Sequence, residues 1–233
     1  MVKGELLGIG LYTAEEAARL LAVHPSTVHR WLVGYSYPLK DQARGHQPAV
    51  VAAGRRHSPE PRVVTFLDLA ELLVIKGFRR HGIPLQQVRV AAEEGSRIFD
   101  TSHPLAATHV VTDGRRIFAE VQSHSGFREM VSLTDRGQYV FVDAVEAYLR
   151  DLDFDPSTGM ANKWWPRGRR GLVVLDPRIG FGTPHVAEAA VPTAAVYELV
   201  EAGENLSSTA DWFGLTPSQV QAAITFEKDL QAA

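Results

Sequence analysis

The residues able to do chemistry are scattered along the 233-residue chain, and no motif gathers them into a catalytic site. The sequence contains no G-x-S-x-G, H-E-x-x-H, P-loop or complete G-x-G-x-x-G pattern. Of the nine histidines, no pair has ligand spacing with a carboxylate partner: His103 and His109 are expected on a loop and a strand edge, and His124 has no oxyanion element nearby. With no cysteine, thiolate zinc sites and disulfides are excluded. We expect no enzymatic activity and no cofactor.

An alternating acidic run at Asp151, Asp153 and Asp155 has the spacing of calcium-loop ligands. A helix–loop–helix calcium site needs Gly at the sixth position of the loop and Glu at the twelfth, and this run has Pro156 and Asn162 there. The sequence therefore favours a solvated turn over a calcium site.

Charge is divided unevenly along the chain. Residues 1–90 carry 12 Lys/Arg against 7 Asp/Glu, whereas residues 171–233 carry 2 against 8. Basic surfaces attract phosphate backbones and acidic surfaces repel them. This asymmetry predicts a nucleic-acid partner for the first part and a protein partner for the last, unless it reflects only uneven solvated faces. No apolar run approaches the roughly 20 residues that span a bilayer, so we expect a cytoplasmic protein without a membrane partner.

Two short helices are predicted near the N-terminus. Thr13 and Glu16 form a capping-box pattern before a helical run at residues 14–22. Pro25 is suited to the first position of a second helix, which Gly34 ends.

The second of these helices has a core face and a polar face. Val28, Trp31 and Leu32 recur at i, i+3 and i+4 and should face the core. The opposite face then carries Ser26, Thr27, His29 and Arg30. This arrangement is typical of a helix-turn-helix that reads the major groove, although a helical hairpin with a polar face has the same pattern.

A basic segment follows. Two short runs typical of β-strands, at residues 49–52 and 62–65, flank Gly54-Arg55-Arg56, which predicts a β-hairpin wing with a basic tip or, alternatively, a flexible basic loop. Wings follow the DNA backbone or minor groove, where arginine is favoured. The residues expected to read bases are His29 and Arg30, and those expected to contact phosphates are Ser26, Thr27, Arg44, Arg55 and Arg56.

Helices are predicted next at residues 66–82 and 85–97. With these, the segments YTAEEAARLLAVHPSTVHRWL and FLDLAELLVIKGFRRHGIPLQQVRVA resemble the MerR-like winged-helix family over residues 10–97. The resemblance implies DNA binding through the second helix and the wing. The long dimerisation helix and effector domain of that family do not follow, so its metal and drug sensing are not implied.

The middle of the chain predicts a hairpin over residues 108–121 around Asp113-Gly114, a strand at residues 138–142 and a helix at residues 143–151. Trp164-Trp165, followed by arginines, suits an interface between packed parts of the chain; a stacking patch for nucleic acid is the alternative.

Three helices are predicted in the last quarter. The first runs from Pro192 to residue 202, the second is capped by Ser207 or Ser208 and ended by Gly214, and the third is capped by Thr216. The pattern is that of a second helix-turn-helix, but its excess of acids disfavours DNA. We expect a protein-interaction or dimerisation module. Its partner anchors, unless they fill the core, are Trp212, Phe213 and Phe226.

Residues 172–231 resemble the family called domain of unknown function 433, with Glu188-Ala189-Ala190 where typical members carry G-T-R. A MerR-like head joined to this domain is similar to VapB-type antitoxins of actinobacteria. That resemblance implies a PIN-domain ribonuclease toxin as partner, and repression of the shared operon through operator double-stranded DNA, with a homodimer on an inverted repeat.

The sequence thus predicts an α+β, mostly helical protein in three parts: a winged helix-turn-helix at 1–97, a connecting region at 98–170 and a small three-helix domain at 171–233. A stand-alone transcription regulator and a dimerisation or scaffold protein that does not bind DNA remain the alternatives.

Overall fold

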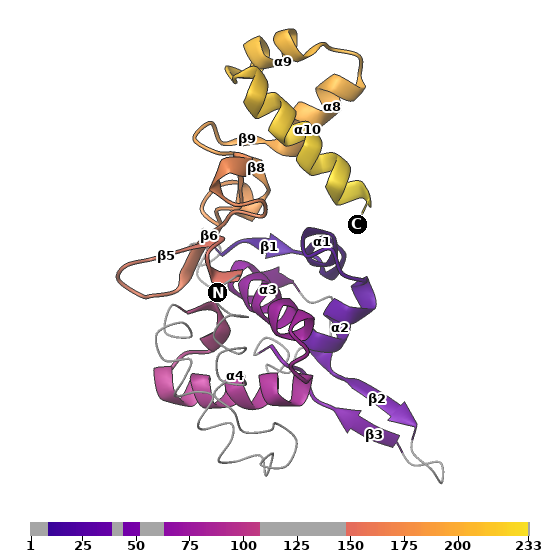
Figure 1. Cartoon of the computed structure of the whole chain (residues 1–233), viewed down its shortest axis with the longest axis vertical. Helices are drawn as coiled ribbons and strands as arrows, with labels where there is room; N and C mark the ends of the chain where they lie inside the picture. The colour runs from indigo at the N-terminus through magenta and orange to yellow at the C-terminus, as the bar shows by residue number, and fades with distance from the viewer. Residues whose placement is uncertain (1–8, 39–43, 52–62, 108–147, 233) are drawn as a thin grey trace, which may run out of the picture.

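The computed structural model describes residues 9–38, 44–51, 63–107 and 148–232, and in these ranges it is mostly helical with four small antiparallel sheets (Figure 1). The predicted α+β class is confirmed. No helix in the described ranges is long and apolar enough to cross a lipid bilayer.

The elements fall into an earlier and a later set along the chain. The earlier set is β1 (Leu11–Tyr12), α1 (Ala14–Leu20), α2 (Pro25–Val33), β2 (Tyr35–Pro38), β3 (Arg44–Gln47), β4 (Val64–Thr65), α3 (Phe66–Arg80) and α4 (Leu85–Phe99). The later set is η3 (Pro104–Ala106), β5 (Leu152–Phe154), β6 (Ala161–Trp164), η5 (Arg169–Gly171), β7 (Val173–Val174), η6 (Gly180–Gly182), β8 (His185–Val186), β9 (Val191–Pro192), α8 (Thr193–Glu201), α9 (Leu206–Phe213) and α10 (Pro217–Ala232).

Side-chain caps start most of these helices where the sequence predicts. Thr13 and Glu16 form the expected capping box of α1, and Thr216 accepts from the Gln219 N–H at the start of α10. The cap of α9 was predicted at Ser207 or Ser208 and lies instead at Asn205, whose side-chain oxygen accepts both of their N–H groups at 3.0 Å. A side-chain amide oxygen is at least as good a cap as a hydroxyl, and it satisfies two donors here.

The hairpin after α2 forms from other residues than those predicted. β2 pairs with β3, so that Tyr35 faces Gln47 and Pro38 faces Arg44, while β4 pairs with β1. Residues 49–51 lie outside any strand, and Val50 and Val51 are buried with their N–H groups bonded to the Trp31 carbonyl. Their apolar character therefore serves the core rather than a strand ladder. Arg55 and Arg56 lie outside the described residues.

Two hydrophobic cores divide the described residues. The first joins α1–α4 to η3, β5 and β6, and the second lies among α8, α9 and α10. Trp164 is buried in the first core, so its side chain packs within the chain; its place at an interface between packed parts stays a prediction. The boundaries at residues 97 and 170 stay a prediction. The elements predicted at 108–121 and 138–142, most of the helix at 143–151, and His109 and His124 lie outside the described residues.

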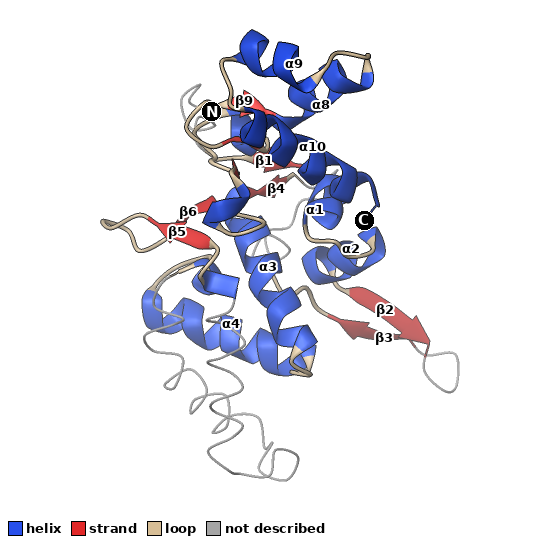
Figure 2. Cartoon of the chain, turned by 45° about the horizontal axis from the view of Figure 1, so that its top comes forward, coloured by secondary structure: helices blue, strands red, loops and turns tan. Residues whose placement is uncertain are grey.

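The later part of the chain is fastened to the earlier part at β1. The Tyr12 hydroxyl donates to the Gly182 carbonyl at 2.9 Å, and burial raises the pKa of Tyr12. α10 runs toward α1 in both views, and Arg167 pairs with Asp229 near its end (Figures 1 and 2).

Gly182 is the critical residue of this junction because its φ is +85° and a Cβ there would overlap the Tyr12 hydroxyl. We expect Gly182→Ala to lower the free energy of unfolding by about 2–4 kcal/mol, from backbone strain plus the steric clash. Gly214→Ala is the matched control, since φ is +65° and nothing lies within 4 Å of the added Cβ; about 1 kcal/mol is expected there. Equal losses in urea denaturation would contradict the proposed clash.

Candidate nucleic-acid interface

Helix α2 presents the two faces that the sequence predicts. Val28, Trp31 and Leu32 are buried. Of the predicted contact residues on the outer side, Ser26, His29 and Arg30 are exposed and Thr27 is half-buried. The helix begins at Pro25, and the His24 side chain accepts the Ser26 N–H. The structure therefore brings these four residues onto one outer surface, and their contact with DNA stays a prediction.

The hairpin β2–β3 is joined rigidly to α2. The Trp31 carbonyl accepts the N–H of Val50 at 2.8 Å and of Val51 at 3.2 Å. Gly34, with φ of +80°, makes the turn from α2 into β2, and a Cβ there would overlap the Gln47 carbonyl. Recognition helix and hairpin are thus held in one fixed geometry.

Helix α4 supports the base of the same hairpin. The Arg89 guanidinium is buried, and its Nε donates to the Pro48 carbonyl at 2.9 Å while a terminal nitrogen donates to Gln47 Oε1 at 3.1 Å. Burial lowers the pKa of Arg89. Arg44 lies exposed at the outer end of β3, so of the predicted wing arginines it is the one that the structure describes.

A cationic groove of about 540 Å³ runs beside α2. Thr27 and Arg30 line one side, and Lys76, Arg79 and Arg80 of α3 line the other. None of the described residues that line the groove is acidic. Burial, and after it the charge of Arg80, lower the pKa of Lys76. Such a groove attracts an anion such as a phosphate.

Tyr35 orients the arginine at the centre of this surface. The Arg30 guanidinium lies over the Tyr35 ring at 5.5 Å, and the Tyr37 ring lies 6.2 Å from that of Tyr35. Stacking on an aromatic ring restrains a guanidinium while leaving its N–H donors available.

Sequence reasoning missed Tyr35 and the three α3 cations. The cluster Arg79-Arg80-His81 with Lys76 one turn earlier is visible in the sequence as a basic helix end. What the sequence does not show is that this end lies beside α2, because the two are about 50 residues apart along the chain. Arg79 also has a structural bond, to the Ile83 carbonyl at 2.8 Å.

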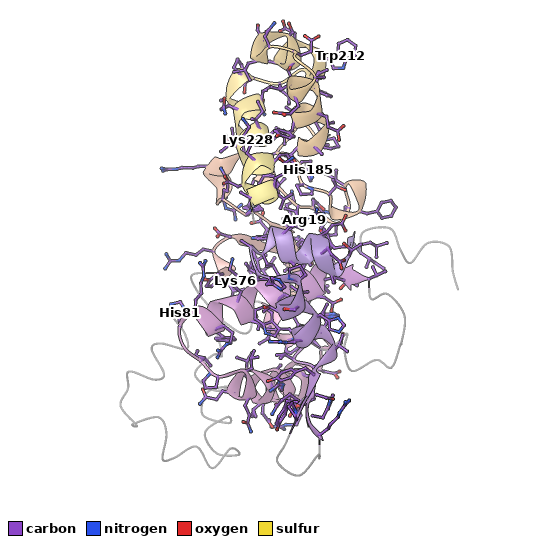
Figure 3. The ribbon with its side chains drawn as sticks, turned by 90° about the vertical axis from the view of Figure 1, so that its right-hand side faces the viewer. Arg19, Lys76, His81, His185, Trp212 and Lys228 are labelled. Atoms are coloured by element: carbon purple, nitrogen blue, oxygen red, sulfur yellow. The ribbon has the colours of Figure 1, made fainter. Side chains whose placement is uncertain are left out.

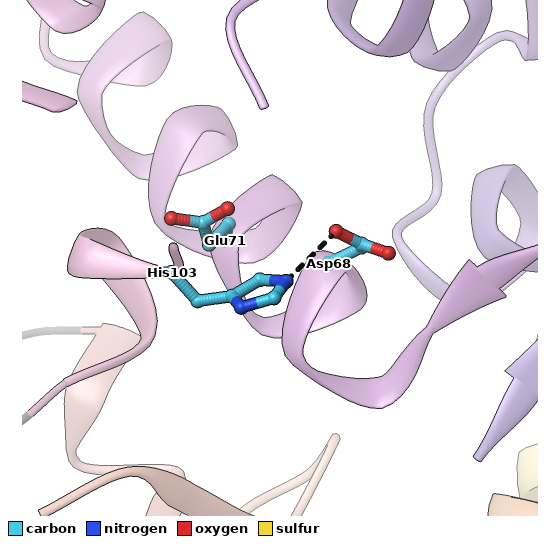
Figure 4. A group of neighbouring side chains, drawn as sticks. All are labelled: Asp68, Glu71 and His103. Carbon is cyan, nitrogen blue, oxygen red and sulfur yellow. Dashed lines mark hydrogen bonds and ion pairs between the residues drawn. The ribbon is translucent and has the colours of Figure 1, made fainter. Parts of the chain in front are cut away.

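A second cluster consists of Asp68 and Glu71, near the start of α3, and His103, which directly precedes η3 (Figure 4). His103 Nε2 lies 3.2 Å from Asp68 Oδ1, a contact between one histidine and one carboxylate that the sequence does not predict. The two residues are 35 apart, so no local spacing reveals the pair. Three ligand atoms lie within 4.8 Å of one another, close enough to share a metal ion.

The bonds that the structure shows in this cluster are structural ones. Asp68 Oδ2 accepts the Thr65 N–H at 2.9 Å in the α3 capping box, and Glu71 Oε1 accepts the Leu105 N–H at 3.1 Å. Both carboxylates are 1% exposed. The cluster thus fastens η3 onto α3, and with it the chain that leaves the helix-turn-helix.

Two residues of the acidic run form hydrogen bonds or ion pairs within the chain. Asp155 accepts the N–H groups of Ser157 and Thr158, as a turn residue does, and Asp153 bonds to Trp165 and Arg169.

The aromatic residues predicted as partner anchors differ in their exposure. Phe226 is buried and Phe213 packs against the second core, so both serve packing. Trp212, by contrast, is 79% exposed.

Comparisons with known proteins agree with this geometry. A family model described as "Putative DNA-binding HTH domain" matches residues 10–92, and that of "Protein of unknown function (DUF433)" matches residues 173–226. The crystal structure of Rv2018 from Mycobacterium tuberculosis superposes with a TM-score of 0.67 at 25% identity, covering 93% of this chain and 97% of that one. Fold and matches define a helix-turn-helix protein with a C-terminal domain of the 433 type.

Two curated relatives come from the same organism. "Putative antitoxin VapB45" is 32% identical over 224 residues, 93% of each chain. "Uncharacterized protein Rv2308" is 26% identical over 243 residues, 96% of this chain and 92% of that one. The chain belongs to the family of the relative called "Putative antitoxin VapB45".

Substitution of His103 tests whether its bond to Asp68 helps to hold η3 against α3. His103→Ala should lower the free energy of unfolding by about 1–3 kcal/mol, because Oδ1 of the buried Asp68 carboxylate loses a hydrogen-bond partner. His103→Gln, which keeps an N–H donor, should lose less. Chemical denaturation checks both, and a His103→Ala protein as stable as the unsubstituted one would exclude the structural role.

Proposed function

We propose that the chain is the antitoxin of a type II toxin–antitoxin pair. It binds operator DNA through a MerR-like winged helix-turn-helix and represses its own operon, and it neutralises a PIN-domain ribonuclease toxin. The observation that carries the DNA half is the exposed polar face of α2 beside a cationic groove with no acidic lining residue. Family membership supports the antitoxin half.

Helix α2 suits the major groove. Arg30 and His29 read base edges, because arginine bonds guanine with two N–H groups. Ser26 and Thr27 lie at the helix N-terminus, where phosphate oxygens are favoured. The flanking backbone then passes over Lys76, Arg79 and Arg80, and the hairpin with Arg44 follows the adjacent backbone. We assign Arg55 and Arg56 to the same backbone contact on their sequence.

The antitoxin half requires no chemistry of its own. The C-terminal module binds the toxin and covers its working surface, with one antitoxin chain consumed per toxin held. Operator binding uses a homodimer whose two α2 helices read an inverted repeat, since a two-fold protein matches a two-fold site.

Arg30→Ala tests base reading. Loss of a two-pronged contact to guanine should weaken binding to the chain's own promoter by about 1–3 kcal/mol, with little effect on unrelated duplex. Arg170→Ala is the matched control, as it removes an exposed arginine that does not line the groove. Mobility shift measures both, and equal promoter binding by the Arg30 variant and the unsubstituted chain would remove Arg30 from the interface.

Arg80→Ala tests the groove. A lost phosphate contact should lower specific and non-specific affinity alike and reduce the slope of log affinity against log salt by about one. Fluorescence anisotropy over a salt series measures the slope. An unchanged slope would show that α3 lies away from the DNA.

Co-expression with the neighbouring ribonuclease and pull-down tests the whole function. Promoter binding without capture of a ribonuclease would favour the stand-alone regulator. Capture without any promoter binding at low salt would favour a partner-binding scaffold.

A further inference from the structure

The surface of α8, α9 and most of α10 carries no cationic side chain. From residue 179 to residue 227 the chain has six Asp/Glu and no Lys or Arg, and every one of these residues is described. Exposed members of this acidic set are Glu188, Glu198, Glu201, Glu204 and Asp211. This is the most one-sided distribution of charge in the described residues, and the function derived from α2 and its groove makes no use of it.

Trp212 projects from this surface into solvent. It is 79% exposed, whereas Trp31 and Trp164 are each 5% exposed and Trp165 is bonded to Asp153. Figure 3 places Trp212 at the top of the molecule, well away from Lys76 and His81. Tryptophan side chains usually stabilise a protein by burying a large apolar area, and an exposed indole does not do so. Tryptophan is also enriched among the residues that contribute most of the binding energy at protein interfaces.

Trp212 and its neighbour Phe213 lie on different sides of α9. Phe213 packs against the second core, which contains Val196, Ala210 and Val220. Successive residues on a helix point about 100° apart, and in α9 Phe213 is the one that contacts this core while Trp212 is exposed. The exposure of Trp212 therefore goes with the way α9 packs through Ala210 and Phe213.

We propose that Trp212, with the acidic residues around it, is the docking site for the toxin. This rests on the proposed function and specifies its second contact. The partner surface is an apolar slot for the indole, bordered by Lys and Arg side chains.

Charge selects this occupant over the others. Duplex DNA is repelled by the acidic set. Two copies of the same anionic surface repel each other, which disfavours a homodimer through Trp212. A ribonuclease, by contrast, must hold a polyanionic backbone and carries cations to do so. An anionic antitoxin surface can cover these cations and exclude RNA directly.

The geometry also separates the two activities. α9 lies at the end of the molecule away from β2–β3 (Figure 1). A toxin seated on Trp212 therefore leaves the outer face of α2 uncovered.

The experiment uses the full chain and the product of the neighbouring gene, which the proposed function expects to be a ribonuclease. Trp212→Ala should weaken their complex at least 10-fold and leave promoter binding unchanged, which shows that the chain is folded. Phe181→Ala is the matched control, because it removes an aromatic side chain that is 52% exposed but lies on η6, outside α9. Asp211→Lys should also weaken the complex, through repulsion of the partner's cations.

A direct readout of burial is acrylamide quenching. The quenchable emission that Trp212→Phe removes from the free chain should be protected in the complex. Toxin affinity unchanged in Trp212→Ala would overturn the docking site while the antitoxin function stands. Dissociation of the chain's own oligomer by Trp212→Ala, with toxin affinity kept, would assign the surface to a second copy instead. If the unsubstituted chain holds no ribonuclease, the proposed function itself is contradicted and the docking site with it.

Discussion

The Trp31 carbonyl is the point on which the surface proposed to bind DNA depends. It accepts the N–H groups of Val50 and Val51, so the chain leaving the hairpin is tied to the last turn of α2. The Trp31 indole is buried in the core of the same domain, and Gly34 brings β2 directly out of the helix end. Recognition helix, hairpin and core are consequently one rigid unit. A protein that must fit two surfaces of a duplex at once gains from such preorganisation, because less conformational freedom is lost on binding.

Opposite charges lie at the two ends of the molecule, and the proposed function gives a reason for their separation. A chain that bound both a nucleic acid and a protein that itself binds nucleic acid would have to keep these partners, and its own copies, from competing for one surface. The cations of α2 and α3 gather around one groove, and residues 179–227 exclude cations altogether. Between them, the hydrogen bond from the Tyr12 hydroxyl to the Gly182 carbonyl joins the earlier part of the chain to the later part.

Local signals account for what the sequence predicts well. Pro25, Gly34 and the i, i+3, i+4 pattern of Val28, Trp31 and Leu32 place α2 and its two faces without any tertiary knowledge. The hairpin was misplaced because Val50 and Val51 have strand propensity, yet their N–H groups bond to Trp31, and only the folded chain shows this. The groove was not predicted for the same reason, because α2 and α3 are far apart in the sequence and lie side by side only in the folded chain.

Pairs far apart in sequence were the least predictable. His103 and Asp68 are polar residues without a motif, and their bond exists because η3 packs onto α3. Trp212 and Phe226 looked equally suited to a partner surface from their residue types, and the structure separates them by exposure.

Hydrogen–deuterium exchange of the full chain with a duplex of its own promoter tests the division of labour most directly. The account predicts slower exchange in α2, in the hairpin β2–β3 and in the last turns of α3, with no change over residues 193–232. Slower exchange in α8–α10 with α2 unaffected would contradict it.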